Sequence, residues 1–164
     1  MWTISVLASL LLGVSATAKA PATKIDADSL RHDERRGITI FEGNVSLSRD
    51  GLLMKGGRLE LRQLPNGTSK GLLWGSPATI RQQRLGGQEW VIGEANRIEY
   101  DSGSQVSILD GAASLRRMQG EILKERLSGD RLRYNHVKEE YIVDSSEAEG
   151  RARLILLPQG KEPR

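Results

Sequence analysis

Apolar and polar residues alternate along most of this chain with a period of two, which is the side-chain period of a β-strand. The alternation occurs in short runs such as ITIFEGNVSLS, GRLELRQ and NRIEYDS, separated by turn-forming residues. Pro65-Asn66-Gly67 is the strongest hairpin signal, because Asn-Gly readily adopts positive φ angles. No stretch after residue 21 repeats apolar residues at helical spacing. The pattern predicts an all-β protein of many short antiparallel strands.

One short pattern occurs twice in the chain. FEGNVSL begins at Phe41, and LDGAASL, with the same order of large apolar, acidic, glycine and small residues, begins at Leu109. In the same register Asp28 matches Asn96, and further along MKGGRLEL matches LSGDRLRY. Alternating sequences resemble one another by chance, but shared glycine positions in the same order make chance a poor explanation. The repeat predicts two copies of one multi-strand unit.

The matched glycines Gly43 and Gly111 stand in the middle of predicted strands. Glycine weakens strand pairing, so at such a position it indicates a bulge, a bend or the close approach of another group to the backbone. The two half-units are predicted at about residues 23–92 and 93–158, and together they form one domain over residues 23–158.

The N-terminus predicts export from the cytoplasm. The sequence MWTISVLASLLLGVSATAKA contains an apolar run over residues 4–14, which is too short to span a bilayer and is typical of a signal peptide. An Ala-x-Ala site predicts cleavage after Ala18, so we expect a signal peptide at 1–18 and a linker at 19–22. An uncleaved short anchor is the alternative. Residues 159–164 are predicted to be a short tail.

Alternation also assigns side chains to the two faces of a strand. Phe41, Val45 and Leu47 share one side of their strand, and Glu42 and Ser46 share the other. One apolar and one polar side is the pattern of an antiparallel sheet folded over a single interior. That interior is either an ordinary hydrophobic core or a groove that holds a lipid, and alternation does not distinguish between them.

The sequence does not predict catalysis. It has no P-loop, no G-x-S-x-G and no H-E-x-x-H motif, and it lacks cysteine. His32 and His136 each lie in a polar, turn-like stretch, so we expect both to be exposed and without a metal-binding role. We expect no cofactor and no metal. A net charge of +3 and an aromatic content of 4% also argue against a nucleic-acid partner.

An export signal followed by IDADSL, FEGNVSL, GGRLEL, GSPATI, GEANRIEY, LDGAASL and GDRLRY resembles the OstA-like family of periplasmic lipopolysaccharide-transport proteins. The resemblance covers about residues 23–158. It implies a single twisted, partly open β-jellyroll whose interior carries the acyl chains of lipopolysaccharide. It also implies a passive periplasmic bridge between the inner and outer membranes, because the chain has no nucleotide-binding motif of its own.

The resemblance implies partners as well. Members of the family join head to tail through edge strands, and they connect LptC at the inner membrane to LptD–LptE at the outer membrane. The edges expected here are Thr23–Asp28, Glu140–Asp144 and Arg151–Leu157. Two alternatives stay open: a membrane-anchored, LptC-like jellyroll of the same pathway, and a structural or interaction β-module with a closed core and no lipid.

The alternation of side chains between strand faces, the repeat and the resemblance together select residues for two candidate sites. The expected lipid-binding interior consists of Ile25, Phe41, Val45, Leu47, Leu59, Leu61, Ile80, Ile98, Tyr100, Leu109, Leu115, Leu132, Tyr134 and Leu154. The candidate rim for lipid phosphates consists of Arg81, Arg84, Arg116, Arg117, Lys124 and Arg126. Each interior position is equally compatible with a core that touches no ligand, and each basic residue with a solvated charge.

Overall fold

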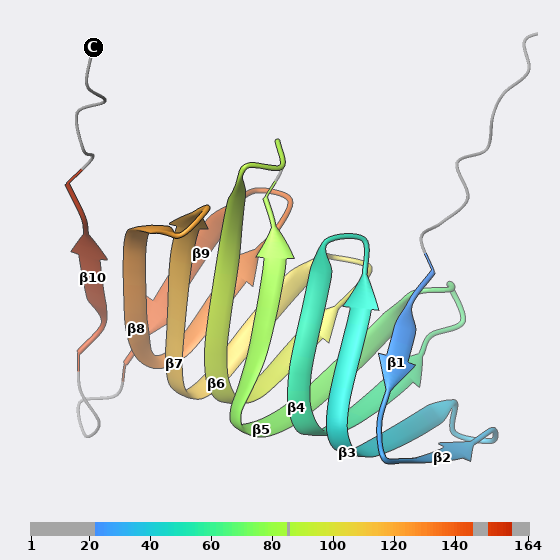
Figure 1. The fold of residues 1–164 in the computed structure, drawn as a ribbon. Helices are drawn as coiled ribbons and strands as arrows, with labels where there is room; N and C mark the ends of the chain where they lie inside the picture. Colours follow the sequence, from blue (N-terminus) through green and yellow to red (C-terminus); the bar gives the residue numbers. More distant parts are fainter. Residues whose placement is uncertain (1–21, 85, 146–150, 159–164) are drawn as a thin grey trace, which may run out of the picture.

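The computed structural model describes residues 22–84, 86–145 and 151–158, so the predicted signal peptide and tail lie outside the described residues. Within them every regular element is a β-strand, as the alternation predicts (Figure 1). The strands are β1 (Lys24–Asp26), β2 (Ser29–Asp33), β3 (Ile38–Arg49), β4 (Leu52–Gln63), β5 (Ser69–Gln83), β6 (Glu89–Asp101), β7 (Val106–Gln119), β8 (Ile122–Asn135), β9 (Glu140–Asp144) and β10 (Arg153–Leu156).

The strands form one antiparallel sheet in the order β1-β3-β4-β5-β6-β7-β8-β10. Strand β2 also pairs with β3, and β9 also pairs with β8, so each end of the sheet has two short edge strands. From β2 to β9, neighbours in sequence are neighbours in the sheet because hairpins connect them. The predicted turn at Asn66-Gly67 is one of these hairpins: Gly67 has a φ of 81°, and the Thr68 N–H donates to Asn66 Oδ1 at 3.1 Å.

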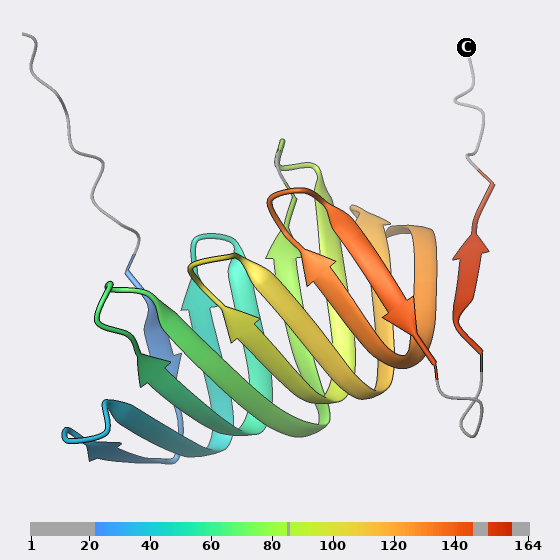
Figure 2. The same ribbon diagram turned by 180° about the vertical axis from the view of Figure 1, so that it is seen from behind.

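All long strands bend at the same level. The register is interrupted in mid-strand in each pairing from β3 to β8, for example between Glu42 and Val45 and between Asp110 and Ala113. Because each interruption lies beside the next, the sheet folds along one line into two facing layers (Figures 1 and 2). We call them the β2–β9 layer and the β1–β10 layer, after the short strands at their edges.

The hydrophobic core lies between the two layers. Every long strand contributes to it, and the side chains of Leu59, Ile98 and Leu132 are fully enclosed. Complete burial of one such side chain is worth roughly 1.5–3 kcal/mol relative to exposure. The jellyroll architecture expected from the sequence is therefore present, with a core between two layers that follow one another along the fold (Figure 2).

The repeated glycines have the same structural role in both halves. Gly43 has a φ of 78°, and a Cβ atom built there would lie 2.2 Å from Asp28 Oδ2. Asp28 is held in place because its N–H donates to the Gly43 carbonyl at 2.9 Å and Asn44 Nδ2 donates to its carboxylate at 2.8 Å. Gly111 also has a φ of 78°, and its Cβ would lie 2.8 Å from Asn96 Nδ2. Each glycine thus combines a bulge with a close approach.

We expect Gly43→Ala to lower the free energy of unfolding by about 2–3 kcal/mol, because the methyl group adds a clash to an unfavourable φ angle. Urea unfolding measures the loss. Gly67→Ala is the matched control: its φ of 81° is nearly the same, but nothing lies within 4 Å of the added atom. A loss at Gly67 as large as the loss at Gly43 would contradict the close-contact explanation.

Candidate functional site

Several cavities open between the layers, and two of them lie toward opposite ends of the interior. The first-half cavity has a volume of about 80 Å³, and the second-half cavity has a volume of about 320 Å³. The apolar part of the first cavity's lining includes Leu47 and Met54 from one layer and Leu59, Leu61 and Tyr100 from the other. The second has an apolar floor of Val91 and Leu115 beneath charged side chains. Buried side chains of the two layers pack into one core cluster, so a long apolar ligand requires the layers to separate.

The structure places most of the predicted interior residues between the layers. Ten are buried, and Ile25, Leu61 and Tyr100 are partly buried and packed against the core. The ten buried residues are Phe41, Val45, Leu47, Leu59, Ile80, Ile98, Leu109, Leu115, Leu132 and Tyr134. Their burial is compatible with a lipid groove and with a closed core alike.

Leu154 is the exception among the predicted interior residues, because it is 50% exposed. It pairs with Leu127 of β8 and therefore lies on the inward side of the β1–β10 layer. Strand β10 is the last strand of that layer and pairs only with β8, at the end of the fold (Figure 1). Leu154 is exposed because no described strand follows β10 in this layer, and its predicted contact with acyl chains stays a prediction.

A buried carboxylate that the sequence did not identify lies in the second-half cavity. Glu125 of β8 is only 5% exposed, and Arg117 of β7 donates from Nε to Glu125 at 3.0 Å. Arg117 also donates from Nη1 to Glu89 at 3.1 Å. The hydroxyl of Tyr141 in β9 donates to Glu125 from the opposite layer, and this bond raises the pKa of Tyr141. Two polar groups on facing layers are thus joined inside the interior.

A second contact crosses the opening at the same end. Arg84 follows β5 in the β1–β10 layer, and Glu139 precedes β9 in the β2–β9 layer. Their side chains form an ion pair, and Arg84 Nη1 also lies 2.6 Å from Glu89. The hydrogen bond with Glu139 raises the pKa of Arg84.

The sequence did contain one signal for this charged cluster. Side chains alternate between the two faces of a strand, so Glu125, two residues before inward-facing Leu127, must also face inward. An acidic residue at a position where an apolar one is expected was that signal.

The structure does not bring the six predicted basic residues together. Arg84 and Arg117 point toward the second-half cavity and are paired there with carboxylates. Lys124 lies at the register interruption between β7 and β8. The three that point outward from the β1–β10 layer are Arg81, Arg116 and Arg126. A single rim of cations around the interior is therefore not formed.

His136 is not an exposed residue, which corrects the sequence-based prediction. Its ring packs edge-on against Tyr134 and Tyr100, with centroid distances of 4.6 and 5.9 Å. Its Nε2 lies 2.7 Å from Ser107 Oγ, and its backbone N–H donates to the Gln105 carbonyl at 3.0 Å. Burial lowers the pKa of His136 to about 4. The polar stretch that contains His136 directly follows β8, and it places the imidazole against the inner side of the β2–β9 layer.

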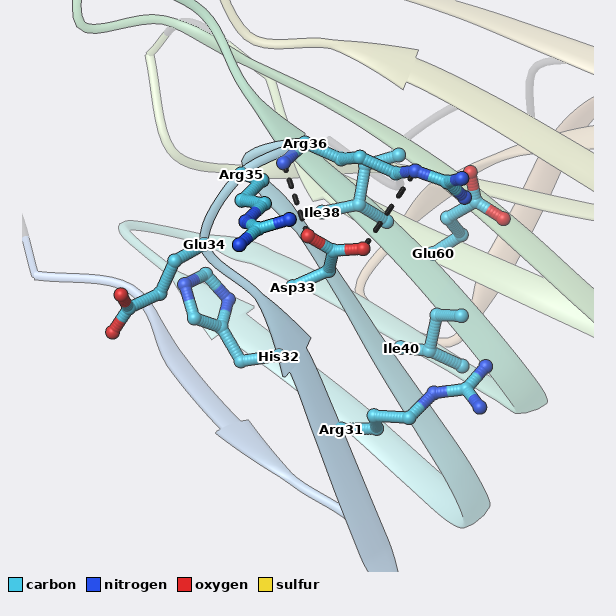
Figure 3. Close-up of a pocket in the computed structure, with 9 residues that line it drawn as sticks. All are labelled: Arg31, His32, Asp33, Glu34, Arg35, Arg36, Ile38, Ile40 and Glu60. Atoms are coloured by element: carbon cyan, nitrogen blue, oxygen red, sulfur yellow. Dashed lines mark hydrogen bonds and ion pairs between the residues drawn. The ribbon is translucent and has the colours of Figure 1, made fainter.

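A larger hollow lies outside the interior, at the β2–β3 hairpin, and has a volume of about 700 Å³. Figure 3 shows Arg36 reaching over Asp33, with which it makes an ion pair at 3.7 Å. Its wall mixes several arginine and acidic side chains on the outer face, with exposed His32 at its border. Within the described part of the chain no group of three His, Cys, Asp or Glu side chains is placed to hold a metal ion. Ile38 and Ile40 add an apolar part to this wall, so the hollow is half polar and half apolar.

These features define a class of protein: a two-layer antiparallel β-roll with an apolar interior and cavities between its layers. No helix in residues 22–84, 86–145 or 151–158 is long and apolar enough to cross a membrane.

Comparison with known proteins places the chain within this class. The chain belongs to the family described as LptA/(LptD N-terminal domain) LPS transport protein, whose model matches residues 24–140. It is 24% identical over 137 residues to the lipopolysaccharide export system protein LptA of Haemophilus influenzae, a match that covers 82% of this chain and 76% of that protein. The family expected from the sequence is thereby confirmed.

A solved structure shares the fold. The crystal structure of LptH, the LptA homologous periplasmic component of the lipopolysaccharide transport device of Pseudomonas aeruginosa, aligns with a TM-score of 0.74. The match covers 84% of this chain and 96% of LptH, at 17% sequence identity. At that identity the likeness establishes the fold, and it confirms the predicted jellyroll.

Proposed function

We propose that this protein binds lipopolysaccharide in the periplasm and carries it, without catalysis of its own, from the inner to the outer membrane. The observation that carries the proposal is an apolar interior with cavities between its layers, in a chain that belongs to a family of lipopolysaccharide-transport proteins. The acyl chains lie between the two layers, and the sugar-bearing head remains outside, along the open side of the roll.

The energetics favour a dry path over free diffusion. Exposing an acyl chain of about a dozen methylenes to water costs on the order of 10 kcal/mol, at about 0.8 kcal/mol per methylene. The first-half cavity offers Leu47, Leu59 and Leu61 as a replacement for water. It holds only about 80 Å³ in the absence of ligand, so we expect the layers to separate when a chain enters.

The partners follow from the edges of the sheet. Strands β1 and β2 at one end, and β9 and β10 at the other, each pair on one side only, which leaves backbone N–H and C=O groups for another strand. We propose that copies of this chain join head to tail there, and that the terminal copies meet LptC and LptD–LptE by the same strand addition. Exposed Leu154 and Leu156 on β10 support this, because such an apolar edge is normally covered in an assembly.

A photo-crosslinker at Leu47 or Tyr100 is expected to capture lipopolysaccharide, because both side chains line the first-half cavity. A crosslinker at Glu42 or Ser46 is the matched control on neighbouring outward positions, and it should capture little. Mass spectrometry of the crosslinked protein, isolated from envelope extracts, measures the difference. Equal capture from both faces would contradict the placement of acyl chains between the layers.

The N-terminal assignment has a separate test. If residues 1–18 are a cleaved signal peptide, N-terminal sequencing of the exported protein should begin at Lys19. A mature chain that retains residues 1–18 would instead support the membrane-anchored, LptC-like alternative. Neither outcome affects the assignment of the interior.

A further inference from the structure

The two outer faces of the roll differ in charge. Opposed residues of an antiparallel pair lie on the same face, so the strand registers identify every outward side chain. On the β1–β10 layer, which faces the viewer in Figure 1, only Asp26 and Glu94 are acidic among the paired outward positions. The cationic outward side chains are Lys24, Lys55, Arg81, Arg116, Arg126 and Arg153.

On the β2–β9 layer the cations are balanced by acids. Three ion pairs on this face are Arg58–Glu42 (in direct contact), Arg97–Asp110 at 2.6 Å and Lys70–Asp101 at 3.5 Å. Glu60 and Glu99 lie in a cross-strand row between the outward cations Arg31 and Arg133, with Ile40, Leu72 and Ile108 at the positions between them. Both outer faces belong to the same sheet. The balanced charge of the β2–β9 face therefore serves as a comparison for the charge of the β1–β10 face.

On the basic face the acids are already engaged. Lys24 lies 3.0 Å from Asp26, and Arg116 is paired with Glu94. Among the described residues no carboxylate is paired with the four other cations, which are all exposed. These four are Lys55, Arg81, Arg126 and Arg153. Asp130 lines one hollow with Arg126 and Arg153, but the six outward cations still outnumber the acids, so the face carries a net positive charge.

Apolar side chains lie among these cations. One cross-strand row consists of Leu53, Arg81, Ile92, Arg116, Arg126 and Ile155, which come from six neighbouring strands. At about 4.8 Å per strand the row extends for roughly 25 Å. Trp90 lies at its border, with the Arg81 guanidinium 3.9 Å from the ring centroid. An indole beside lysine and arginine side chains is the composition that favours the interface between water and a lipid bilayer.

We propose that the outer face of the β1–β10 layer docks on the surface of a bilayer that contains anionic phospholipid. A broad, gently curved sheet face with spread cations fits a continuous layer of phosphate groups better than a single small ligand. The bilayer lies outside the roll, so this surface is distinct from the interior that holds the acyl chains of the cargo. Docking would hold the open side of the roll at a fixed orientation to the membrane.

Vesicle sedimentation of the mature full-length protein tests the proposal. Vesicles of phosphatidylglycerol and phosphatidylethanolamine should bind the protein at low salt, and vesicles of phosphatidylcholine should not. Each basic residue near an anionic surface contributes about 1 kcal/mol, which is about a fivefold change in binding. The double variant Arg81→Gln/Arg126→Gln should therefore lower binding to anionic vesicles by about 25-fold. Raising the salt to about 0.5 M should also release the protein, because it shortens electrostatic range.

The matched control is Arg62→Gln/Arg133→Gln, which removes two exposed outward cations from the β2–β9 layer. It should change vesicle binding less than twofold. Equal losses for the two double variants would overturn the proposal, since net charge alone would then explain binding. Equal binding to neutral vesicles, which the apolar β10 edge could cause, would overturn it as well. Absence of binding to any vesicle would overturn it in favour of an acidic protein partner.

Discussion

Replacing Leu61 by aspartate is expected to lower the affinity for lipopolysaccharide at least tenfold while leaving the protein folded. Leu61 lines the first-half cavity and is only partly buried, so its side chain can turn toward water in the empty protein. With an acyl chain in place, the new carboxylate would lose that water, and burying an uncompensated charge costs several kcal/mol. A tenfold loss corresponds to about 1.4 kcal/mol. Titration with fluorescently labelled lipopolysaccharide measures the affinity.

Arg62→Asp is the matched control for this substitution. It introduces the same carboxylate at the next position of β4, on the outer face. We expect little change in affinity, and thermal unfolding of both variants separates loss of binding from loss of structure. If folded Leu61→Asp protein bound lipopolysaccharide as tightly as the unmodified chain, acyl chains would not occupy this end of the interior.

The second large effect concerns acid stability. Burial lowers the pKa of His136 to about 4, whereas an unfolded histidine has a pKa of 6.5. The unfolded chain therefore binds a proton that the folded chain does not, in the window between these values. The contribution of neutral His136 is fully present above pH 6.5 and is lost as the pH falls through about 4. The total loss is about 3 kcal/mol at 1.36 kcal/mol for each pKa unit.

The variant His136→Gln is expected to remove this component, so its free energy of unfolding should fall less steeply between pH 7 and 4. Urea unfolding at several pH values measures the free energy of unfolding of both proteins. Both contain the same carboxylates, so subtracting one curve from the other removes the carboxylate contribution. His32→Gln is the control at an exposed histidine. Parallel curves for the original chain and His136→Gln would contradict the assignment of a buried neutral imidazole.

Local pattern was sufficient for much of the fold. Strict alternation in ITIFEGNVSLS and NRIEYDS predicted strands, and it placed Phe41, Leu47 and Ile98 on the inward face, where they are buried. The repeated glycines predicted an irregularity in mid-strand, and Gly43 and Gly111 both stand at the bend between the layers. These features could be read from the sequence because strand periodicity and positive φ angles depend on neighbouring residues.

The sequence-based predictions failed where the residues that surround a side chain in the fold come from distant parts of the chain. His136 belongs to a polar hairpin, but Tyr100 and Ser107 from another hairpin surround its ring. Leu154 faces inward, but it is exposed because no described strand follows β10 in its layer. The charged cluster around Glu125 combines strands β6 to β9 with the loops that carry Arg84 and Glu139. None of these pairings has a sequence spacing that identifies it.

The sequence by itself determined the strands, the repeat, the bulges and the apolar side of each strand, because each of these depends on short-range periodicity and on the conformational freedom of glycine. Only the tertiary structure decided which side chains meet across the interior, how the two ends differ and which outer face carries a net positive charge. Those properties depend on strand register summed over the whole sheet. A shift of one residue would exchange the faces, and the register is set by bulges whose alignment exists only after the sheet has folded.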